Sequence, residues 1–276
     1  MGTWIMAGVT FREAARKKML WMALAAGCAF LALFGTGLHF QAKDFAARGM
    51  NPIMRRELSS TMLIMGLYAV DLLAVLMTIL MSVDTLSGEI ASGTIQAVVT
   101  KPVSRWQVLL GKWIGFVGML TAYIAIMVGG VNVIAYFMAG ISVPHLMRGF
   151  LLMWMESVVL LSVTFAFAAY FSTLTCGVLA LGLHGLAFIG GWIEQIGAFT
   201  QTTRAINVGV IASVIMPSES LWRRAAFEMQ SPLANAIRIS PFGTLSVPSP
   251  AMIVYSGMYM AIALVIAIRR FSGRDL

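Results

Sequence analysis

Charged residues are scarce in this chain. Asp, Glu, Lys and Arg make up 11% of it, whereas a soluble globular domain carries roughly 25%. Hydrophobic residues make up 59% of the chain and the mean hydropathy is +0.87. So little charge leaves too few polar groups to cover a water-facing surface. The composition therefore excludes a soluble globular domain and indicates an integral membrane protein.

Metal-binding and catalytic patterns are also missing from the sequence. The two cysteines, Cys28 and Cys176, sit at or inside apolar runs and lack the spacing of a metal site. We interpret both as small apolar side chains. No H-E-x-x-H or G-x-S-x-G arrangement occurs, which argues against an intramembrane enzyme. The basic residues follow no nucleic-acid-binding motif, so no nucleic-acid partner is expected.

A nucleotide-binding loop is missing as well. The Walker A motif, which cradles the phosphates of ATP, has the form G-x-x-x-x-G-K-S/T. The only Gly-Lys pair is Gly111-Lys112; Trp113 follows it, and Trp106 stands where the first glycine belongs. If ATP drives this chain, a separate subunit must bind the nucleotide. We therefore expect a non-catalytic subunit with no cofactor of its own.

Six apolar runs are long enough to cross a bilayer, whose hydrocarbon core of roughly 30 Å takes about 20 helical residues. Their sparse charge and length do not fit the short alternating strands of a membrane barrel. The prediction is an all-α polytopic membrane protein, with one transmembrane domain over residues 1–276 and a tight hairpin between the fourth and fifth spans. The six runs cover residues 19–40, 61–83, 113–138, 149–170, 174–197 and 251–268.

The segment before the first span, residues 1–18, mixes basic and apolar side chains. It is either an amphipathic helix lying in the membrane interface or a plain basic tail. The first apolar run is of span length and no small-residue cleavage pattern ends it, so we do not expect a cleavable signal peptide. Both termini are short and dense in Lys and Arg, which places both in the cytoplasm.

Two carboxylates, Asp71 and Glu156, fall inside apolar runs. Asp71 lies about 15 Å along its span, near the membrane midplane. A charge there costs at least about 2.5 kcal/mol, so both groups should face the bundle interior, a cavity or each other. They are either a proton relay or the lining of a substrate path, or they only hydrogen-bond between helices. Glu194, near a span end, is expected at the membrane interface.

The fifth run is rich in glycine. Gly182, Gly190 and Gly197 fall on roughly one side of the predicted helix. Small residues let membrane helices approach closely, so this side is interpreted as a packing face or a dimer seam. His184 lies among these glycines and is expected to make a polar contact rather than bind a metal.

Residues 198–249 form a long segment that is predicted to be a loop on the external side of the membrane. Its part 205–216 is apolar but too short to span, so it is re-entrant or interfacial. The stretch after Pro217 is predicted to be an amphipathic helix on the membrane surface. This external helix contains Arg223, has Trp222 as its interfacial anchor, and pairs Arg224 with Glu228 at i,i+4. It is either a lid over an exit path or a plain surface helix.

The polar segment 84–112 is longer than a turn between two spans requires. Ser87 can cap a first helix, and Pro102 stops that helix because the residue before proline is pushed out of helical geometry. Ser104 and Gln107 have the spacing of a capping box for the next helix. The prediction is a rigid pair of helices suited to docking a partner at the membrane surface.

Several short motifs match a known family. On them the chain resembles the membrane subunit of bacterial type-2 ATP-binding-cassette (ABC) exporters, and it is similar to the six-span permeases of nitrous-oxide-reductase maturation systems. Lys101 departs from the small residue expected before the proline. The stronger motifs are Gly88-Glu89, Gly93-Thr94, Lys101-Pro102-Val103-Ser104-Arg105 and Leu110-Gly111-Lys112; the weaker ones are Arg12-Glu13, Pro217-Ser218-Glu219, Leu221-Trp222-Arg223 and Arg274-Asp275-Leu276.

The resemblance implies an export permease in the bacterial inner membrane. Its partners would be ABC ATPase subunits that bind ATP and Mg, a second permease subunit in a homo- or heterodimer, membrane lipid, and in some systems an external accessory protein. The residues implied at the ATPase-coupling interface are Glu89, Gly93, Thr94, Ile95, Lys101, Pro102 and Arg105.

Two other functions stay open. One is a proton-coupled secondary transporter that uses Asp71 and Glu156. Against it, the sequence shows no internal repeat and no pair of broken helices in corresponding halves. The other is a non-transporting scaffold that relays the motion of an ATPase to an external partner.

Overall fold

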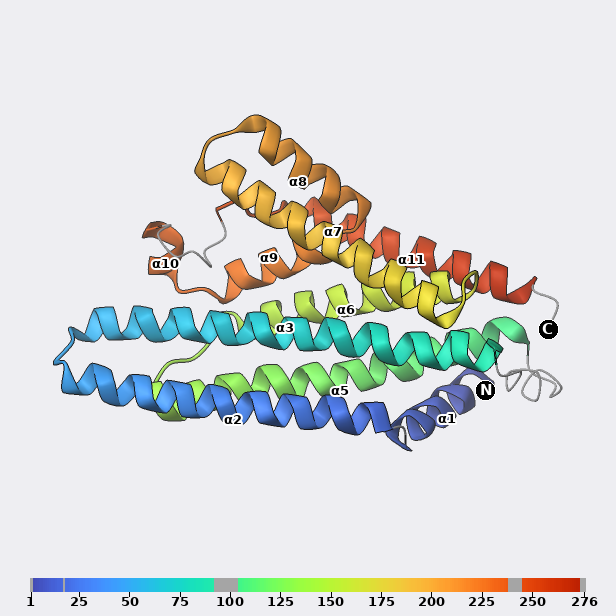
Figure 1. The fold of residues 1–276 in the computed structure, drawn as a ribbon, viewed down its shortest axis with the longest axis horizontal. Coiled ribbons are helices and arrows are strands. Elements are labelled where there is room, and N and C mark those ends of the chain that lie inside the picture. Colours follow the sequence, from blue (N-terminus) through green and yellow to red (C-terminus); the bar gives the residue numbers. More distant parts are fainter. Residues whose placement is uncertain (1, 17, 92–103, 238–244, 274–276) are drawn as a thin grey trace.

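The computed structural model describes residues 2–16, 18–91, 104–237 and 245–273 (Figure 1). Within these ranges all regular structure is helical. The helices are α1 (Gly2–Arg16), α2 (Lys18–Ala47), α3 (Pro52–Ala91), α5 (Arg105–Ala139), α6 (Leu146–Ala168), α7 (Thr173–Phe199), α8 (Thr203–Ile215), α9 (Ser218–Met229), α10 (Pro232–Ile237) and α11 (Ala251–Ser272).

Six of these helices are long and apolar enough to cross a membrane: α2, α3, α5, α6, α7 and α11. Five of them contain one of the six predicted runs, and α6 covers the sixth except for its last two residues; the prediction of an all-α polytopic membrane protein is confirmed. Several helices continue beyond their apolar run. Helix α3, for example, begins at Pro52, where the fixed φ of proline suits the first helical position.

The helices form an elongated bundle whose two ends differ (Figure 1). One end, called the α1 end below, holds α1, the end of α3, the start of α5, the α6–α7 turn and the end of α11. The opposite end holds the α2–α3 turn, the α5–α6 connection and α10. Two glycines with positive φ, Gly49 and Gly140, turn the chain at the opposite end, since a residue without Cβ adopts this geometry at no steric cost.

Helix α6 forms the centre of the bundle. It packs against α3, α5, α7, α9 and α11, and almost every residue from Glu156 to Ala166 is buried. Helices α2 and α11 lie at the periphery and expose large apolar side chains such as Leu33, Phe40 and Ile262. Exposed apolar side chains on long helices are what a lipid-facing surface requires.

Helix α1 lies directly against α5. A Cβ on Gly111 would come 2.8 Å from the carbonyl oxygen of Thr3, and one on Gly115 would come 2.9 Å from that of Ala7. The two glycines therefore allow the backbones to approach. The side chains of Trp4 and Ile5 point outward and are exposed. The N-terminal segment is thus a helix packed on the bundle.

Candidate functional site

Helices α8 and α9 form a bent pair, called the re-entrant loop below. Their axes are bent by 109° at a short break, and both outer ends lie toward the end away from α1 (Figure 1). Helix α8 packs on α7, and α9 packs on α6. The tip, Met216 to Ser220, is buried. This arrangement fits the re-entrant one of the two predictions for residues 205–216, and it also fits one broken span.

Glycines allow α8 to lie close to α7. A Cβ on Gly209 would come 2.6 Å from the carbonyl oxygen of Gly190, and one on Gly197 would come 2.8 Å from the Cβ of Ala205. Gly190 and Gly197 thus form a packing face within the subunit, as predicted. Gly182 differs, because nothing lies within 4 Å of the position of its Cβ.

These contacts make a matched pair of variants. We expect Gly209→Ala to lower the free energy of unfolding by about 1–3 kcal/mol, because the added methyl group meets backbone that cannot move aside. Gly182→Ala is the control, since its methyl group enters open space and alanine favours the helix. Unfolding in a denaturing-detergent titration measures both; equal stability of the two variants would contradict the described packing.

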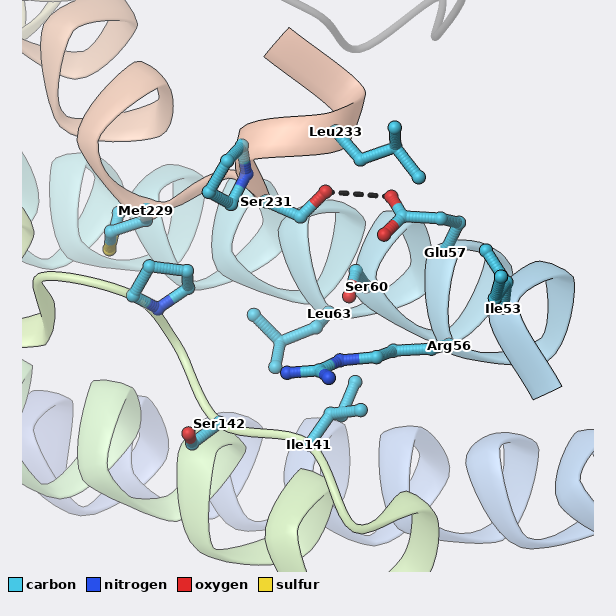
Figure 2. A pocket seen from close by; sticks show the side chains of 12 residues that line it. Ile53, Arg56, Glu57, Ser60, Leu63, Ile141, Ser142, Met229, Ser231 and Leu233 are labelled. Carbon is cyan, nitrogen blue, oxygen red and sulfur yellow. Dashed lines mark hydrogen bonds between the residues drawn. The ribbon is translucent and has the colours of Figure 1, made fainter. Parts of the chain in front are cut away.

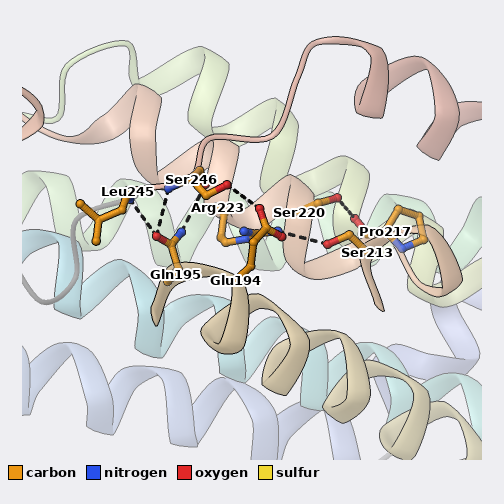
Figure 3. Close-up of polar contacts among 8 residues, drawn as sticks. All are labelled: Glu194, Gln195, Ser213, Pro217, Ser220, Arg223, Leu245 and Ser246. Carbon is orange, nitrogen blue, oxygen red and sulfur yellow. Dashed lines mark hydrogen bonds and ion pairs between the residues drawn. The ribbon is translucent and has the colours of Figure 1, made fainter. Parts of the chain in front are cut away.

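A buried ion pair ties α9 to α7 (Figure 3). Arg223 donates through Nη2 to Glu194 Oε2 at 2.9 Å and to Ser213 Oγ at 3.1 Å. The two charged side chains are only 2% and 6% exposed. The hydroxyl of Ser246 donates to the other carboxylate oxygen, Glu194 Oε1. One buried carboxylate thus joins α7, α9 and the segment leading to α11.

Gln195, the next residue on α7, extends this network. Its Oε1 accepts the backbone N–H of Leu245 at 2.8 Å and that of Ser246 at 3.2 Å (Figure 3). Arg224 behaves differently from Arg223: it is partly exposed, donates to the carbonyl of Pro248 at 2.8 Å, and lies 3.6 Å from a carboxylate oxygen of Glu228.

The prediction of an external helix on the membrane surface is wrong for α9. Trp222 is fully buried, and its ring packs edge-on against Tyr68 of α3 with centroids 4.5 Å apart. Arg223 and Glu194 are buried inside the protein too; the predicted depth of Glu194 at the membrane interface stays a prediction. The pattern misled because a polar stripe that faces buried ionic partners has the same spacing as one that faces water.

Three carboxyl groups meet near the tip of the re-entrant loop: Asp71 on α3, Glu156 on α6 and Glu219 on α9. Their residues are 8%, 0% and 3% exposed. Asp71 lies beside Glu156, and Glu219 is close enough to interact with their charges. Asp71 and Glu156 therefore face the bundle interior and each other, as predicted. Gly191 leaves room for Glu219, since a Cβ there would lie 2.6 Å from Glu219 Cγ.

His184 of α7 also contacts the tip. Its Nδ1 lies 3.0 Å from the hydroxyl of Ser218. The predicted polar contact is confirmed, and the described residues contain no group of three His, Cys, Asp or Glu side chains that could hold a metal. Sequence reasoning missed Glu219; the available signal was the pair Gly190-Gly191, which marks a close approach on α7.

A pocket of about 380 Å³ lies at the opposite end of the bundle (Figure 2). Ser231 donates to Glu57 Oε2 at 2.6 Å and so connects the start of α3 to the segment after α9. The side chain of Arg56 extends past Leu63 toward Ile141. The pocket is lined by Ile53, Arg56, Glu57, Ser60, Leu63, Ile141, Ser142, Pro144, Met229, Ser231, Pro232 and Leu233.

The predicted ATPase-coupling residues lie at the α1 end or outside the described residues. Glu89 is in the last turns of α3 and Arg105 is the first residue of α5. The prediction that Ser87 begins a helix is wrong, because α3 continues without a break from Pro52 to Ala91. The coupling residues outside the described part of the chain are Gly93, Thr94, Ile95, Lys101 and Pro102.

The start of α5 agrees with the prediction in position but not in detail. Ser104 is the N-cap residue and is extended, with φ −66° and ψ 141°. Its carbonyl accepts the N–H of Gln107 at 2.9 Å, but its side chain makes no capping hydrogen bond. The predicted capping box is therefore not formed through the Ser104 hydroxyl.

With this geometry in place, the comparison with known families is decisive. The family model described as "ABC-2 family transporter protein" matches residues 4–276, which is nearly the whole chain. The chain belongs to the ABC-2 transporter family. A comparison with curated proteins gave no match.

Membership in the ABC-2 family gives the buried site its setting. The chain is a permease subunit of an ABC transporter: a multi-pass membrane component that works with ABC ATPase subunits. The re-entrant loop and the carboxyl cluster then lie inside a transport subunit.

Proposed function

We propose that this chain is the permease subunit of an ABC exporter. It forms a translocation path with a second permease subunit, alike or different, and takes its motion from separate ATPase subunits that bind ATP and Mg. One observation carries the proposal: the end of α3, the start of α5, α1 and the end of α11 gather at one end of the bundle (Figure 1). That end can offer a single surface to a partner.

The two long helices at that surface supply a route for the motion. Helix α3 runs unbroken from Pro52 to Ala91. It carries Tyr68, whose ring packs on Trp222 of α9, and Asp71, which interacts with the charge of Glu219 of α9. Since packed helices move as rigid bodies, an ATPase that shifts the end of α3 also shifts the groups that hold the re-entrant loop. ATP binding would thereby open the path beside that loop.

We place the α1 end in the cytoplasm of a bacterial inner membrane. Arg12 of α1, Arg105 of α5, and Arg269 and Arg270 of α11 lie at this end, and the two termini are short segments beside span ends, where the positive-inside rule gives basic residues most weight. The pocket near Arg56 then lies on the outer side, where an external accessory protein could bind. The similarity to nitrous-oxide-reductase maturation permeases stays a prediction.

The adjoining carboxyls of Asp71 and Glu156 favour a second candidate, a proton-coupled secondary transporter. Such a protein would transport without an ATPase, and its activity would stop with a proton uncoupler or with Asp71→Asn. An ABC permease needs ATP hydrolysis instead. A scaffold would support ATP hydrolysis and bind an external protein without transporting a substrate.

Cross-linking to an ABC ATPase that co-purifies with this chain tests the proposed function. In a background with Cys28→Ala and Cys176→Ala, Arg105→Cys places a thiol at the α1 end and Arg148→Cys places one at the opposite end. We expect the ATPase to co-purify and to cross-link only from position 105. Failure to recover the ATPase, or a cross-link from position 148, would overturn the proposal.

A further inference from the structure

The three carboxyls at the centre of the bundle come from three different helices. Asp71 of α3, Glu156 of α6 and Glu219 of α9 are called the carboxyl triad below. All three residues are more than nine-tenths buried. Glu219 lies in the tip of the re-entrant loop, so the triad forms where that loop meets the long helices α3 and α6.

Few positive charges face this cluster. Among the described residues Arg223 of α9 interacts with Glu219, but its guanidinium is already paired with Glu194 of α7 at 2.9 Å. The other titratable groups nearby are Tyr68 of α3, which interacts with Asp71 and Glu219, and His184 of α7, which contacts Ser218. Four buried carboxyls therefore share one guanidinium.

Hydrogen bonds show the same shortage of donors. Both carboxyl oxygens of Glu156 lack a hydrogen-bond partner among the described residues, although Glu156 is fully buried and the carboxyl of Asp71 lies beside it. Two adjoining carboxylates repel each other, whereas one shared proton turns the repulsion into an O–H···O bond. The described residues contain no group of three His, Cys, Asp or Glu side chains that could hold a metal ion, whereas a proton needs only the two adjoining carboxyls.

We propose that the carboxyl triad is a proton-binding site that holds the tip of the re-entrant loop inside the bundle. One proton bound to Asp71 or Glu156 forms the O–H donor that Glu156 lacks. A second proton neutralises Glu219 of α9, which would otherwise repel the carboxylates of α3 and α6. When the loop leaves the bundle, the protons pass to water and the carboxylates become hydrated. The site does not depend on which energy source drives transport.

Infrared spectroscopy of the full chain in lipid nanodiscs tests the site. We expect the wild type to show the C=O stretching band of protonated carboxyl groups at neutral pH. Glu156→Gln and Glu219→Gln should each remove part of this band. Asp44→Asn is the control, because Asp44 is half exposed and paired with Arg48 at 2.9 Å; it should leave the band unchanged. Replacing K⁺ by Na⁺ should also have no effect.

The wild type alone keeps the proposal falsifiable if a variant fails to fold. Raising the pH until the band disappears should lower the amide protection factors of α9, which are corrected for the faster intrinsic exchange at high pH, and leave those of α2 unchanged. Absence of the band at neutral pH, or its persistence in both triad variants, would overturn the proton site. Loss of the band in Na⁺ would show a metal-ion site instead. Unchanged protection factors in α9 after the band is lost would overturn the role of the site in holding the loop.

Discussion

Arg223→Ala is expected to lower the free energy of unfolding by about 3–5 kcal/mol, because it leaves the buried Glu194 without a charge partner. Both side chains of this pair are almost completely buried, so water cannot replace the lost guanidinium. The hydroxyl of Ser213 loses its donor as well. The variant should therefore release α9 from α7 and α8. Denaturing-detergent unfolding followed by circular dichroism measures the loss.

Arg224→Ala is the matched control. Arg224 is the next residue on the same helix, but its side chain is 20% exposed and lies 3.6 Å from Glu228. Partly exposed pairs of this kind contribute about 0–1 kcal/mol. A loss as large in Arg224→Ala as in Arg223→Ala would show that the burial of the charge does not matter.

A double variant separates the lost charge from the lost packing. Arg223→Met with Glu194→Met removes both charges and fills the space with apolar groups. Replacement of a buried ion pair in this way is often neutral, so the double variant should be more stable than Arg223→Ala. If the double variant were much less stable than the wild type, the ion pair itself would be a net source of stability.

The membrane helices could be predicted from the sequence because their signal is local. An apolar run of about 20 residues has few alternatives to a membrane helix, and each predicted run falls on one long helix, to within two residues at the end of the fourth. The start of α5 after Ser104 was predicted for the same reason. The end of α3 was not predicted. Serine is a favourable N-cap residue, so a new helix was expected after Ser87, but α3 continues through this residue to Ala91.

The candidate site could be predicted only in part. The position of Asp71 and Glu156 inside apolar runs was enough to place them in the bundle interior. The role of α9 was not visible, because the partner of Arg223 lies 29 residues away in the sequence and the contact of Trp222 with Tyr68 is more distant still. Pairings of this kind depend on how helices pack, which periodicity does not show.

The second large effect is expected in the connection between α3 and α5. On the proposed function, Gly93→Trp places a bulky ring in the surface that docks against the ATPase, and Glu89→Ala removes a charge from it. We expect either change to abolish the effect of the permease on ATP hydrolysis while the bundle stays folded. Gly93 lies outside the described residues, so this prediction rests on the family and on the position of α3 and α5.

Gly37→Trp is the control for bulk, because nothing lies within 4 Å of the position of its Cβ and its helix, α2, lies at the periphery of the bundle (Figure 1). This variant should assemble with the ATPase and affect hydrolysis as the wild type does. A defect as severe as that of Gly93→Trp would mean that added bulk alone disturbs the subunit.

The central claim is that the permease couples to a separate ATPase. The measurement that tests it most directly is the ATP hydrolysis rate of that ATPase, once purified alone and once in the presence of the permease. The proposed function predicts that the wild type and Gly37→Trp change this rate by the same factor. It predicts that the ATPase mixed with the Gly93→Trp permease hydrolyses ATP at the same rate as the ATPase alone. A wild-type permease with no effect on hydrolysis, or a Gly93→Trp permease with the full effect, would contradict it.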